Sequence, residues 1–301
     1  MLIRDIGAAA ARGASLLAFP GRRIVRDLSG LPETLGRVGS LELKIAVTKK
    51  EIRAIQKMRY RVFFDEGGAV ADAFSRARKR DVCPFDRICD HIIVVDHDFL
   101  TRPGRRKPHV VGAYRVLRQE SVRAPGTFYS ASEFDVAHLV ARHPGKRFLE
   151  LGRSCVLPEY RARRVLELLW RGLWRYVRHH RVDVMFGCAS LPGADAHVHR
   201  DALAFLRAQA EAAPEWSAPA LGGPCLTEGL ASASAAGAKR RGVLALPPLI
   251  KGYLRAGAFF GPDVFVDRAF NTTDVLVVLP VERIESRYIE HFGGAALEAA
   301  A

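Results

Sequence analysis

The sequence predicts an α/β protein in which helices flank a central sheet of mixed strand direction. Short apolar runs typical of strands alternate with segments whose apolar residues recur at helical spacing. The predicted order of the main elements is strand, helix, three strands, helix, strand, helix and two strands, with one further short helix before the last two strands and without internal repeats. A chain of 301 residues can bury one sizeable core, and 49% apolar with 26% charged residues is typical of globular proteins.

The first predicted elements are a strand over 41–47 and a helix over 49–66. The strand alternates as a half-buried strand does. Thr48 and Glu51 have the spacing of a capping box at the start of the helix, and two glycines end it. Polar and basic residues over 69–86 then predict a loop.

The middle of the chain is predicted to hold four strands and one long helix. The strands cover 91–96, 110–117, 147–157 and 182–190, and the helix covers 161–180. The first two strands favour a hairpin with a long connection over 101–109. The long helix has an apolar stripe, and Trp170 and Trp174 lie next to that stripe.

The last third is predicted to hold two helices and two strands. The helices cover 201–212 and 248–257, and the strands cover 264–267 and 274–280. The stretch 217–242 is rich in Gly, Ala, Ser and Pro and predicts a flexible insertion. We expect one domain over 40–293, preceded by a basic, flexible arm over 1–39 and followed by a tail over 294–301.

Charge and hydropathy restrict partners and location. A net charge of +14 and a pI of about 10.0 favour an anionic partner: nucleic acid, an anionic membrane surface or an acidic carrier protein. No window approaches the ~20 apolar residues that span a bilayer. The N-terminal apolar stretch is interrupted by Arg12 and Gly13 and does not resemble a signal peptide. We therefore expect a cytoplasmic protein whose arm can touch anionic lipid at the inner membrane face.

Five cysteines occur without a CxxC pair, so free thiols are expected and no metal site. There is no Walker A loop, no G-x-G-x-x-G, no H-E-x-x-H and no G-x-S-x-G. His91 and Asp96 have the H-x4-D spacing of glycerolipid acyltransferases, but the residues between them are all apolar. Residues five apart on a strand point to opposite faces, so these two should not cooperate.

Several long segments resemble the ornithine-lipid N-acyltransferases, which have a GNAT-like fold and are distant relatives of the acyl-homoserine-lactone synthases. The segments are MRYRVFFDEGG (58–68), FDRICDHIIVVD (85–96), VVGAYRVLR (110–118), RFLELGRSCVLPEYRARRVLELLWRG (147–172), DVMFGCAS (183–190), PPLIKGYLRAGA (247–258) and NTTDVLVVLPVERIESRYIEHFG (271–293). The resemblance implies transfer of a 3-hydroxyacyl group from the phosphopantetheine thiol of acyl carrier protein to the α-amine of L-ornithine. The product would be lyso-ornithine lipid. No metal or other cofactor is implied.

The resemblance also implies a set of site residues, which are Arg59, Phe63, Asp86, Arg115, Glu150 and Arg153. Charged groups on apolar strands are costly to bury unpaired, so they should pair with one another or with substrate. Arg115 or Arg153 suits the carboxylate of ornithine, and Asp86 or Glu150 suits its amines. Glu150 is the expected general base, with Asp86 as the second candidate. The alternative is a set of internal ion pairs that only holds the sheet to the first helix.

The GNAT cofactor loop is usually glycine-rich, but the corresponding segment here, EYRARRVLE (159–167), contains no glycine. This departure weakens a coenzyme A assignment and suits a carrier-borne pantetheine with a single phosphodiester. Arg161, Arg163 and Arg164 at a helix N-terminus oppose the helix dipole, which an anion bound there would explain. A solvated basic turn is the alternative.

Two other functions remain to be separated from this one. An acyl-homoserine-lactone synthase would share the charged set, but the segments over 247–293 fit the lipid enzymes better. A basic nucleic-acid-binding protein would need exposed aromatic residues among its arginines. Trp170 and Trp174 do lie among arginines, but beside the apolar stripe, so we expect them in the core and expect no nucleic acid as partner.

Overall fold

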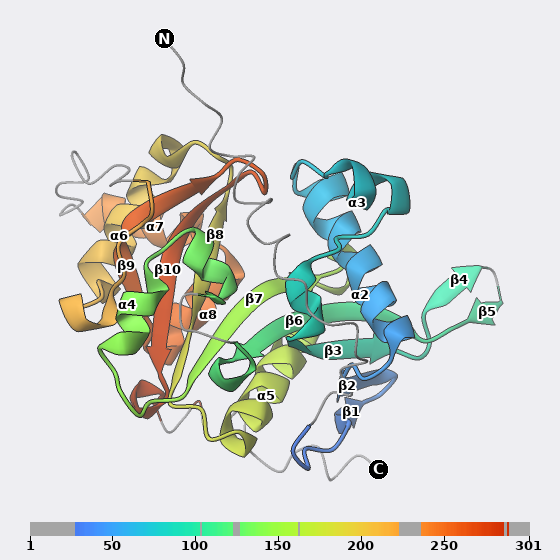
Figure 1. Ribbon diagram of the computed structural model, residues 1–301. Coiled ribbons are helices and arrows are strands. Elements are labelled where there is room, and N and C mark those ends of the chain that lie inside the picture. The colour runs from blue at the N-terminus through green and yellow to red at the C-terminus, as the bar shows by residue number, and fades with distance from the viewer. Residues whose placement is uncertain are drawn as a thin grey trace.

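The computed structural model describes residues 28–102, 104–122, 127–161, 163–222, 236–285 and 288. Its centre is an eight-stranded sheet in the order β1-β2-β3-β6-β7-β8-β10-β9 (Figure 1). The strands are β1 (Thr34–Val38), β2 (Leu41–Ile45), β3 (Asp90–Asp96), β6 (His109–Arg118), β7 (Phe148–Val156), β8 (Val184–Pro192), β9 (Phe259–Asp267) and β10 (Thr272–Pro280). Neighbours are antiparallel except β7 and β8, which are parallel. The predicted mixed α/β sheet is therefore confirmed.

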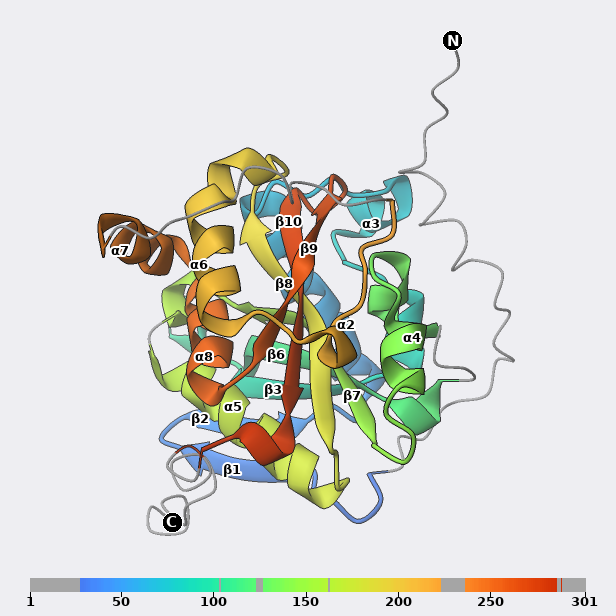
Figure 2. The same cartoon turned by 90° about the vertical axis from the view of Figure 1, so that its left-hand side faces the viewer.

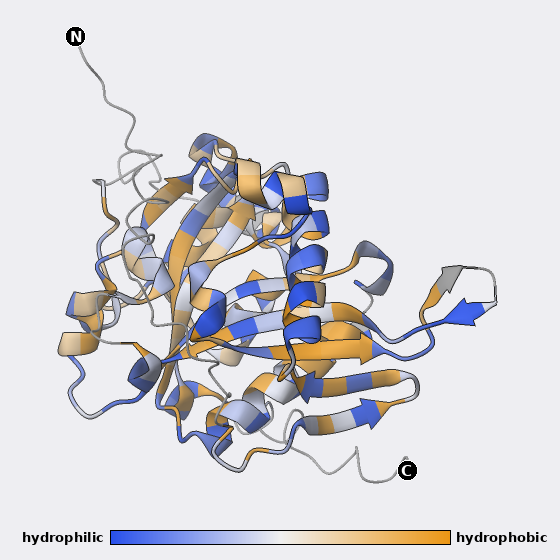
Figure 3. Cartoon of the chain, turned by 45° about the vertical axis from the view of Figure 1, so that its right-hand side comes forward, coloured by the Kyte–Doolittle hydropathy of each residue, from blue (hydrophilic) through white to orange (hydrophobic). Residues whose placement is uncertain are grey.

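Helices cover both faces of this sheet (Figures 1 and 2). The longer helices are α2 (Lys49–Tyr60), α5 (Arg163–His179), α6 (Arg200–Ala210), α7 (Ala236–Ala245) and α8 (Pro248–Ala256), and the shorter ones are α3 (Ala73–Arg78) and α4 (Val136–Ala141). Helices α5, α6 and α8 lie on one face, and α2 and α4 lie on the other. Hydrophobic residues concentrate along the central strands, whereas the outward turns of α2 are hydrophilic (Figure 3). Within the described residues no helix has the length and apolar composition needed to cross a membrane.

The predicted start of the first helix is confirmed in detail. The Thr48 hydroxyl accepts from the Glu51 backbone N–H at 3.2 Å, and the Glu51 carboxylate accepts from the Thr48 N–H at 2.9 Å. The helix continues after Tyr60 as a π-helix, Arg61–Glu66, so the predicted end near residue 66 holds. This π-helix carries Phe63 toward the site described below.

Two boundaries differ from the prediction, and two short helices were not predicted. Helix α3 lies within 69–86, which was expected to be a loop, and α4 lies between the predicted strands 110–117 and 147–157. Thr34–Val38 pairs with β2 as strand β1, so the ordered domain begins before residue 40. Its sequence, TLGRV, has too few apolar residues to show a pattern. The predicted insertion 217–242 includes the first residues of α7, and its part over 223–235 lies outside the described residues. Residues 1–27 of the predicted arm and the whole tail over 294–301 lie outside them as well.

The predicted hairpin of β3 and β6 is confirmed, and its long connection carries a small ribbon of β4 (Leu100–Arg102) and β5 (Arg105–Arg106). Trp170 and Trp174 are each 8% exposed, which places them in the core as expected. Four free cysteines are present among the residues described, and no disulfide joins them.

Strands β7 and β8 part after a short paired section, and this positions the site. They pair only from Phe148 opposite Val184 to Glu150 opposite Phe186, although both continue well beyond (Figure 1). A Cβ at Gly187 would lie 2.2 Å from the Leu151 carbonyl oxygen, so the close approach before the strands part requires glycine. Beyond Glu150, the backbone of β7 thus does not pair with β8.

Candidate active site

Five charged residues predicted from the sequence lie together on the α2 face of the sheet. Arg59 comes from α2, Asp86 from the turn before β3, Arg115 from β6, and Glu150 and Arg153 from β7. The structure adds Asp81, Tyr129 and Ser130 to this group. These three are supplied by loops, and no pattern in the sequence distinguishes them from other loop residues.

Arg59 and Asp86 form a buried, bidentate ion pair. The guanidinium nitrogens lie 2.8 and 2.7 Å from the two Asp86 oxygens, and the Asp81 carboxylate lies 2.9 Å from Arg59 Nε. Gln56 also donates to Asp86 at 2.9 Å. Burial raises the pKa of Asp86, but the charge of Arg59 outweighs it and holds that pKa well below its usual range. Asp86 is consequently a poor proton acceptor, and its main effect is to neutralise and orient Arg59.

Arg115 is held between this pair and two aromatic rings. Its Nη1 lies 3.1 Å from Cys83 Sγ and 3.6 Å from the Asp86 carboxylate. Its guanidinium also faces the rings of Phe85 and Tyr129. The residue opposite Arg115 on β7 is Gly152, which leaves space for the long side chain. At 3% exposure, Arg115 is nearly closed to solvent.

Glu150 binds the backbone of a neighbouring turn. It accepts from the backbone N–H groups of Tyr129 at 2.9 Å and Ser130 at 2.6 Å, and from the Ser130 hydroxyl. These contacts hold the 3-10 turn Tyr129–Ser132 against β7. Burial raises the pKa of Glu150 above its usual value, although hydrogen bonds from Ser130 oppose that shift. The carboxylate therefore has the position to accept a proton through the Ser130 hydroxyl.

Arg153 is the most accessible arginine of the group. Its backbone φ of 49° places it in the left-handed region, at a bulge of β7. Its Nε lies 3.3 Å from Asp81, and its side chain is 11% exposed, against 0% for Arg59. Its guanidinium lies 4.0 Å from the ring centre of Phe270, 4.7 Å from that of Tyr129 and 5.9 Å from that of Phe63. This aromatic frame holds a cation where a substrate carboxylate can reach it.

The predicted phosphate-binding arginines lie on the surface, near the start of α5, rather than in the buried group. Arg161 pairs with Glu66 at 3.0 Å and contacts the Val156 carbonyl, so it joins this turn to the π-helix. Arg164 is exposed in the first turn of α5, and the side chain of Arg163 lies outside the described part of the chain. Arg161 is thus occupied by contacts with the protein itself, whereas Arg164 is exposed to solvent.

His91 and Asp96, which have the H-x4-D spacing of glycerolipid acyltransferases, do not form a common site. His91 lies 3.9 Å from Asp86, whereas Asp96 accepts a hydrogen bond from Tyr160. The H-x4-D spacing therefore makes no common site, as the strand geometry predicted.

Cys155 on β7 lies near the charged group but is unsuited to covalent catalysis. Burial raises the pKa of its thiol to about 12, which makes it a poor nucleophile.

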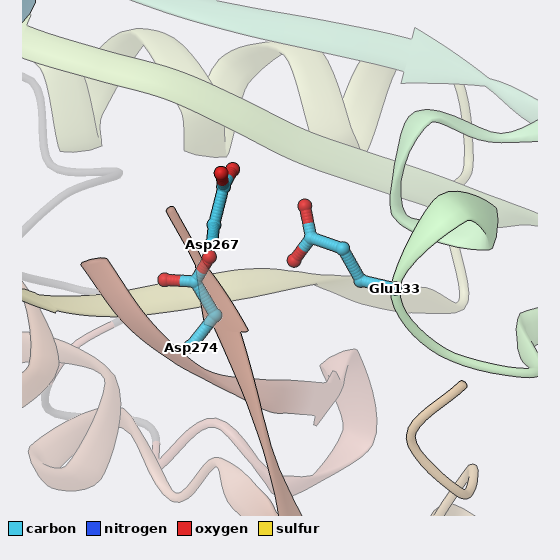
Figure 4. A group of neighbouring side chains, drawn as sticks. All are labelled: Glu133, Asp267 and Asp274. Carbon is cyan, nitrogen blue, oxygen red and sulfur yellow. The ribbon is translucent and has the colours of Figure 1, made fainter. Parts of the chain in front are cut away.

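Three carboxylates gather beside this group. Glu133, Asp267 and Asp274 each offer an oxygen within 4.8 Å of the others (Figure 4). No sequence pattern points to these residues, because they come from a loop and two strands and lie up to 141 positions apart, the separation of residues 133 and 274. No local spacing connects such residues.

Comparison with known proteins identifies the family. The acetyltransferase (GNAT) domain model matches residues 58–171, which include all five charged residues of the site. An L-ornithine N(alpha)-acyltransferase of Agrobacterium fabrum is 50% identical over 282 residues, covering 94% of this chain and 94% of the relative. A protein of the same name from Rhizobium meliloti is 47% identical and covers 88% of each chain. One from Rhodobacter capsulatus is 36% identical, covering 84% of this chain and 95% of the relative.

Similarity to solved structures is weaker. An N-acyl amino acid synthase from uncultured soil microbes has 11% identity and a TM-score of 0.43, over 80% of this chain and 91% of that one. A CoA-dependent acyl-homoserine lactone synthase has 12% identity and a TM-score of 0.44, over 83% of this chain and 85% of that one. The assignment rests on the sequence relatives and the domain match, together with a mixed sheet that carries the matched residues on one face. The chain belongs to the L-ornithine N(alpha)-acyltransferase family of GNAT acyltransferases.

Proposed function

We propose that this enzyme transfers a 3-hydroxy fatty acyl group from acyl carrier protein to the α-amine of L-ornithine, forming lyso-ornithine lipid. The observation that carries the proposal is 50% identity over 94% of both chains to a protein named for ornithine acylation. The carrier donor is supported by the net charge of +14 and by the glycine-free turn at 159–167. The same charge supports contact with an anionic membrane at the cytoplasmic face, where a lipid product would be released.

The acceptor's carboxylate is assigned to Arg153. Arg59 is already neutralised by Asp86 and Asp81, and Arg115 is nearly closed to solvent. Among the described residues, Arg153 forms an ion pair with one carboxylate, Asp81, and keeps part of its guanidinium accessible. A guanidinium binds a carboxylate with two parallel hydrogen bonds, which would orient the α-amine beside it.

The thioester is assigned to the place where β7 and β8 part. The β7 backbone beyond Glu150 has no ladder partner on that side, so its N–H groups are available to bind the developing oxyanion. The amine nitrogen attacks the thioester carbon, an amide bond forms and the carbon–sulfur bond breaks. The pantetheine leaves as a thiolate and takes up one proton from the reacting amine. No metal or other cofactor is needed for this balance.

Glu150 is assigned as the general base, acting through Ser130. The Ser130 hydroxyl donates to Glu150, so its own lone pairs can accept a proton from the substrate ammonium while its proton moves to the carboxylate. Burial raises the pKa of Glu150, which strengthens it as a base. Asp86 fits this role less well because Arg59 and Gln56 occupy its oxygens.

The test is mass spectrometry of products formed by the purified protein from 3-hydroxyacyl carrier protein and a panel of amino acids. We expect N-α-(3-hydroxyacyl)-ornithine as the main product. Coenzyme A that carries the same 3-hydroxyacyl group is the donor control, and it should react more slowly than the acyl carrier protein. Acyl-homoserine lactone formed from S-adenosylmethionine, or no acylated ornithine at all, would contradict the proposal.

A further inference from the structure

The three carboxylates beside the charged group are unusually deep for acidic side chains. Glu133 is 4% exposed and Asp274 is 3% exposed, and Asp267 is partly buried at the end of β9. Figure 4 shows them gathered between the loop that carries Glu133 and the strands β9 and β10. Carboxylates are rarely buried to this extent unless they are paired or hydrogen-bonded.

The protein satisfies these buried carboxylates only in part, through the hydroxyls of Thr272 and Ser190 at Asp274 and the thiol of Cys188 at Glu133. Glu133 Oε2 and Asp274 Oδ1 are both buried and accept no hydrogen bond from any described residue. No Lys, Arg or His nitrogen within the described ranges lies within 4.0 Å of Glu133, Asp267 or Asp274, whereas every other buried carboxylate of the site has a donor. A cationic ligand that supplies N–H donors would satisfy both of these oxygens.

The protonation of the pair agrees with this arrangement. Burial and the charge of Asp274 raise the pKa of Glu133 well above its usual value. Burial also raises the pKa of Asp274, to about 6, although hydrogen bonds from Ser190 and Thr272 oppose the shift. Without a cation the pair tends to hold a proton, and a bound cation can replace that proton.

The carboxylates lie next to the proposed acceptor site. Glu133 directly follows the turn Tyr129–Ser132, which Glu150 binds. Asp267 accepts from the backbone N–H of Phe270 at 3.0 Å, and the Phe270 ring lies under the guanidinium of Arg153. One end of an acceptor held by Arg153 would therefore be close to the acidic cluster.

We infer that Glu133 and Asp274, with Asp267 at the edge, bind the side-chain ammonium of the acceptor amino acid and select a diamino acid over neutral ones. This inference rests on the proposed function. An ammonium carries three N–H donors, which matches three carboxylates. Calcium takes six to eight oxygen ligands, and Asp267 already gives one oxygen to the β9–β10 turn while Thr272 donates to Asp274. The cluster thus fits an ammonium better than such an ion.

The test compares ornithine with norvaline, which has the same carbon chain without the terminal amine. For the wild-type protein we expect kcat/KM to favour ornithine by about 10²-fold or more, because norvaline leaves the buried acids unpaired. In Glu133→Gln and in Asp274→Asn this ratio should fall at least about tenfold, mainly through the KM of ornithine. Glu215→Gln, the same change on an exposed glutamate without a side-chain partner among the described residues, should keep the wild-type ratio.

Each outcome decides the inference. Wild-type protein that acylates norvaline as well as ornithine overturns it even if the variants fail to fold, and leaves the proposed function intact. Folded variants that keep the wild-type ratio overturn it too. A preference that disappears with a chelator and returns with calcium or magnesium would assign the cluster to a metal ion instead. Wild-type protein that acylates no amino acid removes the proposed function and this inference together.

Discussion

At the scale of single residues, the buried charges of the site differ in what neutralises them. Arg59 and Asp86 neutralise each other, so their contribution is to hold α2 and the turn before β3 together. Glu150 is surrounded by donors from one turn, and Arg153 by aromatic rings and one carboxylate. Charged groups that are already neutralised within the protein are suited to hold the structure together. Groups that can still form hydrogen bonds or ion pairs are suited to bind substrate.

Ser130→Ala separates the catalytic role of Glu150 from its structural one. The change removes the hydroxyl of the proposed relay but keeps both backbone N–H groups on Glu150. We expect turnover to fall by about 10²-fold while the thermal midpoint changes little. Glu150→Gln is the comparison: its amide would face a backbone N–H, so turnover and midpoint should both fall. If Ser130→Ala retains wild-type turnover on the same preparation that is melted, the relay is wrong.

Asp274 should make stability depend on pH. Its pKa rises from 3.8 in the unfolded chain to about 6 in the folded protein, so the folded protein holds the proton more tightly. Stability associated with this group is therefore lost as pH rises between these values. Asp274→Asn should gain stability relative to wild type, on the order of 2 kcal/mol between pH 4 and pH 7.

Urea unfolding of wild type and Asp274→Asn across this pH range measures the effect. The difference between the two proteins is the informative quantity, because groups such as Asp86 titrate in both and largely cancel. Glu215→Gln should follow wild type at every pH. If the free energies of unfolding of Asp274→Asn and wild type depend on pH in the same way, Asp274 is not buried as described.

At the scale of elements, the separation of β7 from β8 depends on a close contact just before it. The Gly187 backbone lies against the Leu151 carbonyl, and the β7 bulge at Arg153 follows immediately. Together they turn the two strands apart and aim Arg153 toward Phe270. A parallel pair of strands without this glycine and bulge would continue its ladder and close the place assigned to the thioester.

Gly187→Ala should therefore affect both stability and activity. A methyl group 2.2 Å from a backbone oxygen forces the strands to shift, which we expect to cost about 1–3 kcal/mol. Gly152→Ala is the matched control on the partner strand, since its methyl group would meet Arg115 only at 3.7 Å. Urea unfolding and kcat/KM of both variants give the comparison, and equal effects of the two would argue against the close contact.

At the scale of the whole molecule, the excess of positive charge is the dominant property. Much of the surface charge near the start of α5 is balanced locally, since Arg61 pairs with Glu159 and Arg161 with Glu66. Arg164 is exposed in the same turn. Exposed charge of this kind speeds association with an acidic partner more than it stabilises the fold.

Reversing the charge of Arg163 and Arg164 together should raise the KM for the acyl carrier protein steeply. The penalty should shrink as salt is added, because exposed charges are screened. Arg178→Glu, at the exposed opposite end of α5, is the control and should change KM far less. A KM that stays at the wild-type value at low ionic strength would rule out docking at this turn.

The sequence alone determined the longer elements of the domain, because their signals are local. The capping box at Thr48, the apolar stripe of α5 and the alternation of β2 each depend on residues a few positions apart. It also determined which charged residues gather, since Arg59, Asp86, Arg115, Glu150 and Arg153 lie in segments that resemble known enzymes. Short elements were not predicted, among them strand β1, whose TLGRV sequence has few apolar residues although Leu35 is buried in the core, and helices α3 and α4, which have six residues each.

The tertiary structure decided which of those charges meet. Arg153 pairs with Asp81 and not with Glu150, because the β7 bulge turns it toward α2 and the loops. Glu150 binds the backbone of Tyr129 and Ser130, a contact that residue types alone do not predict. Glu133 and Asp274 come together only when the loop after β6 packs beside β10. Contacts between distant segments depend on strand register and loop path, which the spacing of residues along the chain does not encode.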